Sequence, residues 1–460
     1  MKKNAWKKYS EEDLKELNRV CDDYKEYITV SKTEREAAKE IIRRAKEKGY
    51  RDLEDYRKGN KPILPGDKIY VNNCGKAVAL FLIGEENIEN GMNILGAHID
   101  SPRLDLKANP LYDEKGFAYF DTHYYGGIKK YQWVTLPLAL HGVVVKKDGT
   151  VVDVVIGEDP KDPVVGITDL LPHLGHKQLD KKGDKVVEGE NLDILIGSRP
   201  LKDDKDEDKV KEYILDILKE KYDIEEDDFL SAEIEVVPAG AARDFGLDKS
   251  MIMAYGQDDS VCAYTSLEAF LQFKEVKRTA ACILVDKEEI GSVGATGMRS
   301  HFFDNAIAEI CELMGNKSSL AVRRVLKNSR MLSSDVNAAY DPLYKDVMDE
   351  RNATFFGKGV GFCKFTGSRG KSGSNDANAE YIAKIRKVLD DAKVDFQISE
   401  LGKVDEGGGG TIAYILANYN VDVIDCGVGV LSMHAPWEVT SKSDIYEAYK
   451  CYIAFIKNMK

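Results

Sequence analysis

Short runs of almost entirely apolar residues recur along this 460-residue chain, and segments with helical periodicity separate them. The apolar runs are AVALFLIG at 77–84, MNILGAH at 92–98, AACILV at 280–285 and VDVIDCGVGVL at 421–431. Runs of this length and character are typical of buried strands. The helical segments are 10–28, 33–50, 260–276, 300–315, 377–394 and 443–459. This alternation predicts an α/β fold with a mainly parallel central sheet flanked by helices.

A stretch of different character interrupts the pattern between 107 and 247. FAYFDTHYYGG, VTLPLALHGVVV and VVDVVIG are rich in strand-forming residues, and KKDGT at 146–150 is a turn sequence. A charged loop and an amphipathic helix follow at 201–229, and SAEIEVVPAG reads as another strand. We therefore predict a discontinuous domain, 1–106 and 248–460, with a β-rich domain inserted at 107–247. The chain is also longer than one core usually supports.

Composition excludes several classes of protein. A net charge of −13 is opposite to the basic footprint of a general nucleic-acid binder. No apolar run approaches the ~20 residues that span a bilayer, and no apolar segment follows the basic N-terminus as in a secretory signal. The eight cysteines include no CxxC pair, which indicates reduced and mostly buried thiols. We expect a cytoplasmic protein without nucleic-acid or membrane partners.

Residues with chemically useful side chains stand beside the predicted strands. In an α/β sheet, ligands bind at the carboxyl ends of the strands, so such residues can converge. Each one alone is more often a solvated or capping residue than a ligand. Their joint occurrence in this order favours a single site: His98 and Asp100, Asp258 and Asp259, Glu288 and Glu289, Asp335, and His434.

Two histidines and three carboxylates suit a pair of divalent ions such as zinc, manganese or cobalt. A carboxylate that bridges two metals about 3.5–4 Å apart is a recurring arrangement in aminopeptidases. Asp100 can accept the second ring N–H of His98 and so orient that ligand. Glu288, beside a ligand Glu289, can take the proton of a water that the metals activate.

Five segments in order, GAHIDSPRLDLK, GQDDS, DKEEIGS, SSDVNAA and MHAPWE, resemble the M18 metallopeptidases, the aspartyl aminopeptidase and yeast aminopeptidase I group. The resemblance covers most of the chain, including the insert and PHLGH at 172–176. It implies a zinc-exopeptidase type of fold with a dimerisation domain as the insert. It implies Asp258 as the bridging ligand, Asp259 behind it, Glu288 as general base and Asp100 as the orienting residue. The full ligand set that it implies is His98, Asp258, Glu289, Asp335 and His434.

The same resemblance implies two ions per chain, zinc above all, with cobalt or manganese possible at one site. It implies a homo-oligomer, a dodecamer built from dimers, in which a histidine of one subunit's insert reaches a neighbouring active site. His173 or His176 is the candidate for that role. Arg369 or Lys371 is a candidate partner for an acidic substrate side chain.

These observations favour a co-catalytic two-metal aminopeptidase that removes N-terminal residues from peptides, with a preference for Asp or Glu. One alternative is a metal-dependent amidohydrolase that deacylates N-acyl amino acids. Another is an assembly protein with a vestigial site. That reading predicts degraded ligands, whereas all five ligands and the base are present.

Overall fold

The computed structural model describes residues 3–202 and 209–460, so part of the predicted charged loop, 203–208, lies outside the described residues. Contacts divide the chain into two compact units. Unit 1 comprises Met1–Asp100, Ala242–Met433 and Glu438–Lys460. Unit 2 comprises Ser101–Ala241 and the short segment His434–Trp437.

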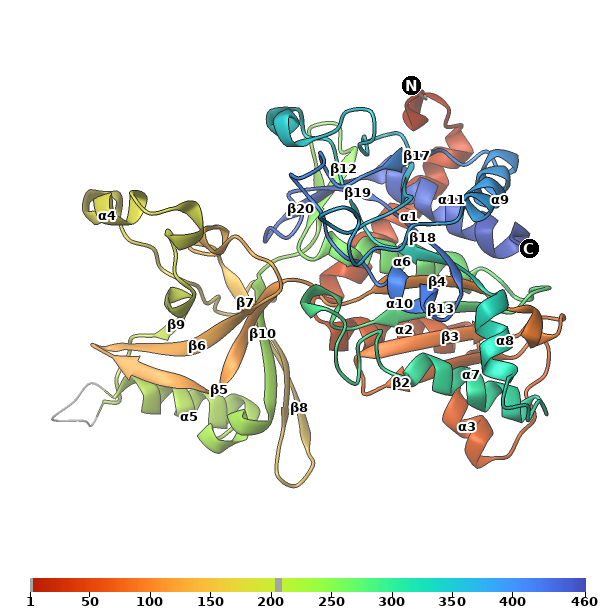
Figure 1. The fold of residues 1–460 in the computed structure, drawn as a ribbon. Coiled ribbons are helices and arrows are strands. Elements are labelled where there is room, and N and C mark those ends of the chain that lie inside the picture. The colour runs from red at the N-terminus through yellow and green to blue at the C-terminus, as the bar shows by residue number, and fades with distance from the viewer. Residues whose placement is uncertain (1–2, 203–208) are drawn as a thin grey trace. The chain divides into compact units, whose positions relative to one another are not determined.

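Unit 1 is built on a nine-stranded sheet whose four central strands, β13, β4, β14 and β18, are parallel (Figure 1). Antiparallel pairings join β3 to β13 and β16 to β18, so the sheet is mixed. Its strands, in spatial order, are β1 (Arg51–Asp52), β2 (Lys68–Asn73), β3 (Ala77–Leu82), β13 (Ala280–Val285), β4 (Asn93–His98), β14 (Arg330–Ser334), β18 (Asp422–Gly427), β16 (Val360–Cys363) and β17 (Phe396–Ser399).

Two hydrophobic clusters fill the faces of this sheet, because successive side chains of a strand point to opposite sides. Leu95 of β4 belongs to one cluster and Ile94 to the other. The first cluster contains residues of α1 (Glu11–Val30), α2 (Glu34–Glu47), α6 (Gln257–Leu271), α9 (Ala379–Asp391) and α11 (Lys442–Asn458). The second contains residues of α3 (Leu53–Lys58), α7 (Phe302–Leu313), α8 (Ala321–Asn328) and α10 (Ala413–Ala417).

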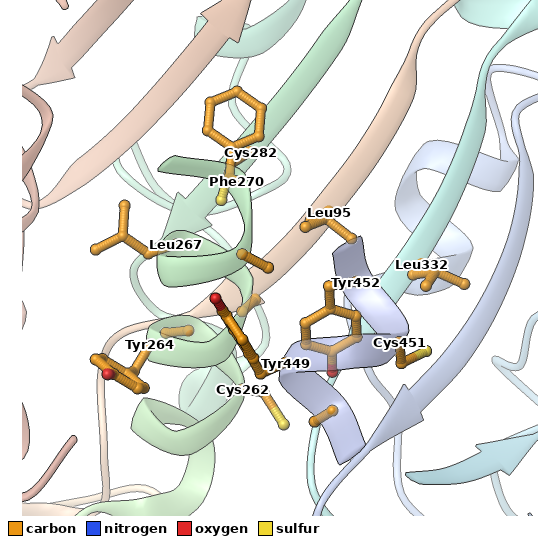
Figure 2. Close-up of a cluster of buried hydrophobic side chains, with 14 of the residues drawn as sticks. Leu95, Cys262, Tyr264, Leu267, Phe270, Cys282, Leu332, Tyr449, Cys451 and Tyr452 are labelled. Carbon is orange, nitrogen blue, oxygen red and sulfur yellow. The ribbon is translucent and has the colours of Figure 1, made fainter. Parts of the chain in front are cut away.

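Helices α6 and α11 form the centre of the first cluster. Figure 2 shows Tyr452 of α11 near Leu95 and Leu332 of the central strands, whereas Tyr264 and Leu267 of α6 point to the other side of that helix. These side chains are at most 1% exposed. The first turn of α6 carries Asp258 and Asp259, so this packing anchors the helix that presents two of the predicted site residues.

A smaller five-stranded sheet in unit 1 also bears on the site. Its strands, in spatial order, are β11 (Arg243–Phe245), β12 (Met251–Ala254), β20 (Glu438–Ser441), β19 (Gly429–Leu431) and β15 (Asn337–Ala338). Strand β12 leads directly into the turn before α6 and pairs antiparallel with β20. The sequence analysis did not predict this sheet, because its strands are only two to four residues long.

Unit 2 contains a six-stranded sheet in which all pairings are antiparallel. Its strands, in spatial order, are β8 (Val151–Ile156), β7 (Leu138–Val145), β10 (Ala232–Pro238), β5 (Arg103–Glu114), β6 (Phe117–Tyr125) and β9 (Ile194–Gly197). Two helices, α4 (His176–Leu179) and α5 (Val210–Tyr222), accompany it. Contacts place the unit boundaries at 100/101 and 241/242, whereas the sequence bounds of the insert were 107–247.

The coarse prediction of an α/β fold is confirmed as a mixed α/β fold with several sheets. All eight cysteines are free thiols and seven of them are buried, as expected. Within the described part of the chain, no helix has the length and apolar character needed to cross a membrane.

Candidate metal centre

Three of the predicted motifs follow neighbouring parallel strands. His98 ends β4 and lies opposite Val285, the last residue of β13. Asp335 comes directly after β14, the neighbour of β4 on its other side. Because parallel strands in register end at the same edge of a sheet, the histidine, the Glu288–Glu289 pair and Asp335 reach one edge.

One donor group consists of His98, Asp258 and Asp335, whose ligand atoms lie within 4.8 Å of one another. Nε2 of His98 is 3.2 Å from Oδ1 of Asp258, and both side chains are buried. An oxygen of Asp258 also lies within 4.8 Å of an oxygen of Glu289. Asp258 is therefore close both to His98 and Asp335 and to Glu289.

Glu288 and Glu289 lie on a 3-10 turn, Glu288–Ile290, that follows β13. The turn is flanked by left-handed backbone at Lys287, φ 67°, and at Gly291, φ 95°. Asp100 holds the turn, because its carboxylate accepts the backbone N–H groups of Glu288 at 3.1 Å and of Glu289 at 3.2 Å.

Asp100 contacts His98 in two ways. Nδ1 of His98 is 2.9 Å from the backbone oxygen of Asp100 and 3.4 Å from its carboxylate. The shorter contact that orients the ring is thus with the peptide oxygen, while the carboxylate is engaged by the Glu288–Glu289 turn. Asp259 completes a related link, since its Oδ2 accepts the backbone N–H of His98 at 3.3 Å.

Asp258 stands on a turn with unusual backbone geometry. Gly256 is left-handed, with φ 70° and ψ 29°, and Asp258 itself has φ −82° and ψ 104°, so the start of α6 is not helical there. The backbone N–H of Asp258 donates to Oε2 of Glu438, at 3.0 Å. Sequence reasoning missed Glu438, although it is the last residue of the MHAPWE segment.

Several carboxyl groups of the site are buried close to one another, and this shifts their pKa values. Burial, and after it the charge of Asp259, raise the pKa of Asp335 well above its ordinary value of 3.8. Burial likewise raises the pKa of Asp259 well above that value. Burial lowers the pKa of His98, but its hydrogen bonds with the carboxyl groups of Asp100 and Asp258 outweigh that effect and raise it well above 6.5.

Such a set of carboxylates is costly to bury unless a cation compensates it. Imidazole nitrogen and carboxylate oxygen are among the usual ligands of zinc in proteins. The residues present therefore fit a divalent metal ion.

Of the other predicted residues, the three histidines belong to unit 2 and Lys371 belongs to unit 1. His434 belongs to the segment His434–Trp437, and its Nδ1 is 2.8 Å from the backbone oxygen of Gly127, also in unit 2. His173 and His176 are exposed residues of unit 2. Lys371 lies in unit 1, where its Nζ is 3.0 Å from a carboxylate oxygen of Asp376.

A family model described as aminopeptidase I zinc metalloprotease (M18) matches residues 27–456. The chain belongs to the M18 family. A probable M18 family aminopeptidase 1 of Clostridium acetobutylicum is 59% identical over 456 residues, which cover 99% of this chain and 98% of the relative. The predicted enzyme class, a metal-dependent aminopeptidase, is thereby confirmed, and so is the predicted family.

Solved structures of M18 proteins have the same fold. The crystal structure of an M18 aminopeptidase from Thermotoga maritima matches with a TM-score of 0.95 at 45% identity and covers all of both chains. Aminopeptidase I from Clostridium acetobutylicum matches with a TM-score of 0.91 at 57% identity over 99% of both chains. An mApe1 dodecamer from S. cerevisiae matches with a TM-score of 0.78 at 18% identity, over 96% of this chain and 97% of that one, which shows the shared fold alone.

Proposed function

We propose that this M18 aminopeptidase is a co-catalytic enzyme that uses two divalent ions, zinc above all, with cobalt or manganese possible at one position. His98 and Asp335 would hold one ion, Glu289 and His434 the other, and Asp258 both. The observation that carries the proposal is the position of Asp258, within 4.8 Å of the donor atoms of His98 and Asp335 and also of Glu289. The match of MHAPWE to the family supports His434 as the fifth ligand.

Two divalent ions bound at this position would polarise the scissile carbonyl and make water acidic enough to attack near neutral pH. Glu288 is the residue proposed to take the proton of the attacking water and deliver it to the leaving amine. Its backbone N–H is fixed by Asp100, so the carboxylate is presented from a turn of defined position.

Substrates would be peptides with a free α-amino group. We propose a preference for acidic N-terminal residues, which a cationic side chain would bind. A cavity of about 280 Å³ in unit 1 is lined by three such side chains, Arg369, Lys371 and Lys403, and by the carboxylates of Glu400 and Asp405. Lys371 already pairs with Asp376, which makes Arg369 the better candidate of the two named from the sequence.

The assembly proposed for the chain is a homo-oligomer, a dodecamer built from dimers, in the cytoplasm. The domain at 107–247 would make the dimer contact, and His173 or His176 would reach a neighbouring active site. The exposed positions of both histidines in unit 2 are compatible with that role. The S. cerevisiae mApe1 structure, which shares this fold, is that of a dodecamer.

The decisive experiment is Glu288→Gln, measured for peptide hydrolysis and for bound metal. We expect turnover to fall by about 10²–10⁴-fold, the range of a lost general base, while the metal content stays at two ions per chain. Retained activity would refute the base assignment. A comparison of free with N-acetylated peptides tests the substrate class, and preferential cleavage of the blocked peptides would favour the deacylase alternative.

A further inference from the structure

Glu438 is a buried carboxylate of β20 that holds the turn carrying Asp258 at more than one point. It is 1% exposed, and its Oε2 accepts the backbone N–H of Asp258 at 3.0 Å. Its backbone oxygen accepts a hydrogen bond from Nε2 of Gln257 at 2.6 Å. The hydroxyl of Thr440, two residues along β20, donates to Oε1 of Gln257 at 2.7 Å.

The turn depends on such contacts because its backbone cannot join the helix. Gly256 is left-handed and Asp258 lies in the first turn of α6, where backbone N–H groups have no acceptor within the helix. A buried N–H group without an acceptor would be costly. The carboxylate of Glu438 supplies a charged acceptor, which makes a shorter and stronger bond than a neutral one.

Packing alone does not explain a charged residue at this position. An ionised carboxylate close to several others is unfavourable in a buried site unless a cation is near. A neutral glutamine has the same length, but its amide oxygen would accept the N–H of Asp258 in a weaker, uncharged hydrogen bond. The carboxylate of Glu438 is bonded to the backbone of Asp258, whose oxygens lie near His98, Asp335 and Glu289, and this contact links Glu438 to the candidate metal site.

We propose that Glu438 is a positioning residue that orients Asp258 through its backbone N–H and thereby sets the affinity of the site for zinc. This inference rests on the proposed function of Asp258 as a metal ligand. Groups that orient metal ligands typically change metal affinity by about 10–100-fold when they are removed. We expect a change of that size for Glu438.

The test compares Glu438→Gln with the control Glu447→Gln. Glu447 is also 1% exposed, and its Oε2 accepts a backbone N–H, that of Asp395, at 2.8 Å, at a place without donor residues of the site. The zinc dissociation constant of each full-length variant is measured by competition with a chromophoric chelator. We expect it to rise about 10–100-fold in Glu438→Gln, with activity restored by excess zinc, and to stay unchanged in Glu447→Gln.

An unchanged zinc affinity in Glu438→Gln, or an equal loss in both variants, would overturn the inference. If Glu438→Gln does not fold, Glu438→Asp, which keeps the charge but shortens its reach, is measured in the same way. There, weakened zinc binding supports the proposal and unchanged binding overturns it. Asp258→Ala distinguishes failure of the inference from failure of the proposed function. If this variant binds zinc as tightly as the wild type, the proposed function fails as well. If it binds zinc more weakly while Glu438→Gln binds it normally, only the role of Glu438 is refuted.

Discussion

Replacing Asp425 by asparagine should stabilise the protein, and the gain should grow with pH. Asp425 lies in β18, opposite Ser333 of β14 and Cys363 of β16, and is 3% exposed. Its Oδ1 accepts a hydrogen bond from the hydroxyl of Thr411 at 2.6 Å. Burial raises its pKa from 3.8 to about 6, and the Thr411 and Ser333 hydroxyls offset only part of that rise.

The sign follows from proton binding in the two states. The folded protein holds the proton of Asp425 more tightly than the unfolded chain does, because its pKa is about 6 rather than 3.8. The protonated carboxyl group therefore contributes its full stabilisation below pH 3.8, and this contribution is lost as the pH rises to about 6. A pKa difference of about 2 corresponds to about 3 kcal/mol. Asparagine is neutral at every pH and can still accept the hydrogen bond from Thr411. We expect the variant to gain about 1.5 kcal/mol at pH 5 and about 3 kcal/mol at pH 8.

The assay is the thermal unfolding midpoint of both proteins from pH 5 to 8. Both are stripped of metal, because zinc binding itself depends on pH. For a unit of this size a gain of 3 kcal/mol raises the midpoint by roughly 5 °C. Asp391→Asn, the same chemical change at an exposed position, should shift it little at any pH. A difference that is constant with pH, or an Asp425→Asn protein less stable at pH 8, would refute the reasoning.

Three further predictions follow from the geometry. In Gly427→Ala the new Cβ would lie 2.0 Å from the backbone oxygen of Asp335, so kcat/KM for a peptide should fall by about 100-fold with loss of bound zinc; Gly183→Ala meets no neighbour within 4 Å and should be unaffected, and equal effects of the two would contradict this. Chelation should abolish hydrolysis and lower the unfolding midpoint, and zinc at 100 times its Kd should restore about 2.7 kcal/mol; a midpoint that does not respond to zinc would argue against the site. Ser10→Ala removes the hydroxyl that caps α1 at 3.1 Å and should cost about 1 kcal/mol in urea unfolding, whereas Ser10→Asp should cost less, and no loss in Ser10→Ala would show that the cap is not needed.

Much of unit 1 was predictable because its signals are local. The apolar run at 280–285 is β13, and the Ser10 start signal begins α1 with a reciprocal cap between Ser10 and Asp13. Helix α8 escaped prediction because it is only eight residues long. The order of the strands could not be predicted from local sequence, since β13 lies between β3 and β4 although about 180 to 200 residues separate it from them in the chain.

The candidate site divides in a similar way. Residue type and position beside strands placed His98, Asp258, Glu289 and Asp335 among the candidate residues of one site, and the structure places an oxygen of Asp258 within 4.8 Å of donor atoms of the other three. The expected contact of Asp100 with His98 exists, but its carboxylate is shared with the backbone of Glu288 and Glu289. Nothing in the local sequence indicated that sharing, because backbone N–H groups are identical at every position.

Sequence alone therefore determined the chemistry of this protein: the kinds of side chain that can hold a metal, the carboxylate beside them and the strands that carry them. Those properties follow from side-chain identity and from periodicities of a few residues. Only the tertiary structure showed which carboxylates group with His98 and that Glu438 and Asp259 accept backbone N–H groups of the candidate ligands. The physical reason is that this distinction depends on hydrogen bonds between segments some 160 to 180 residues apart, and these exist only once the sheets have formed in register.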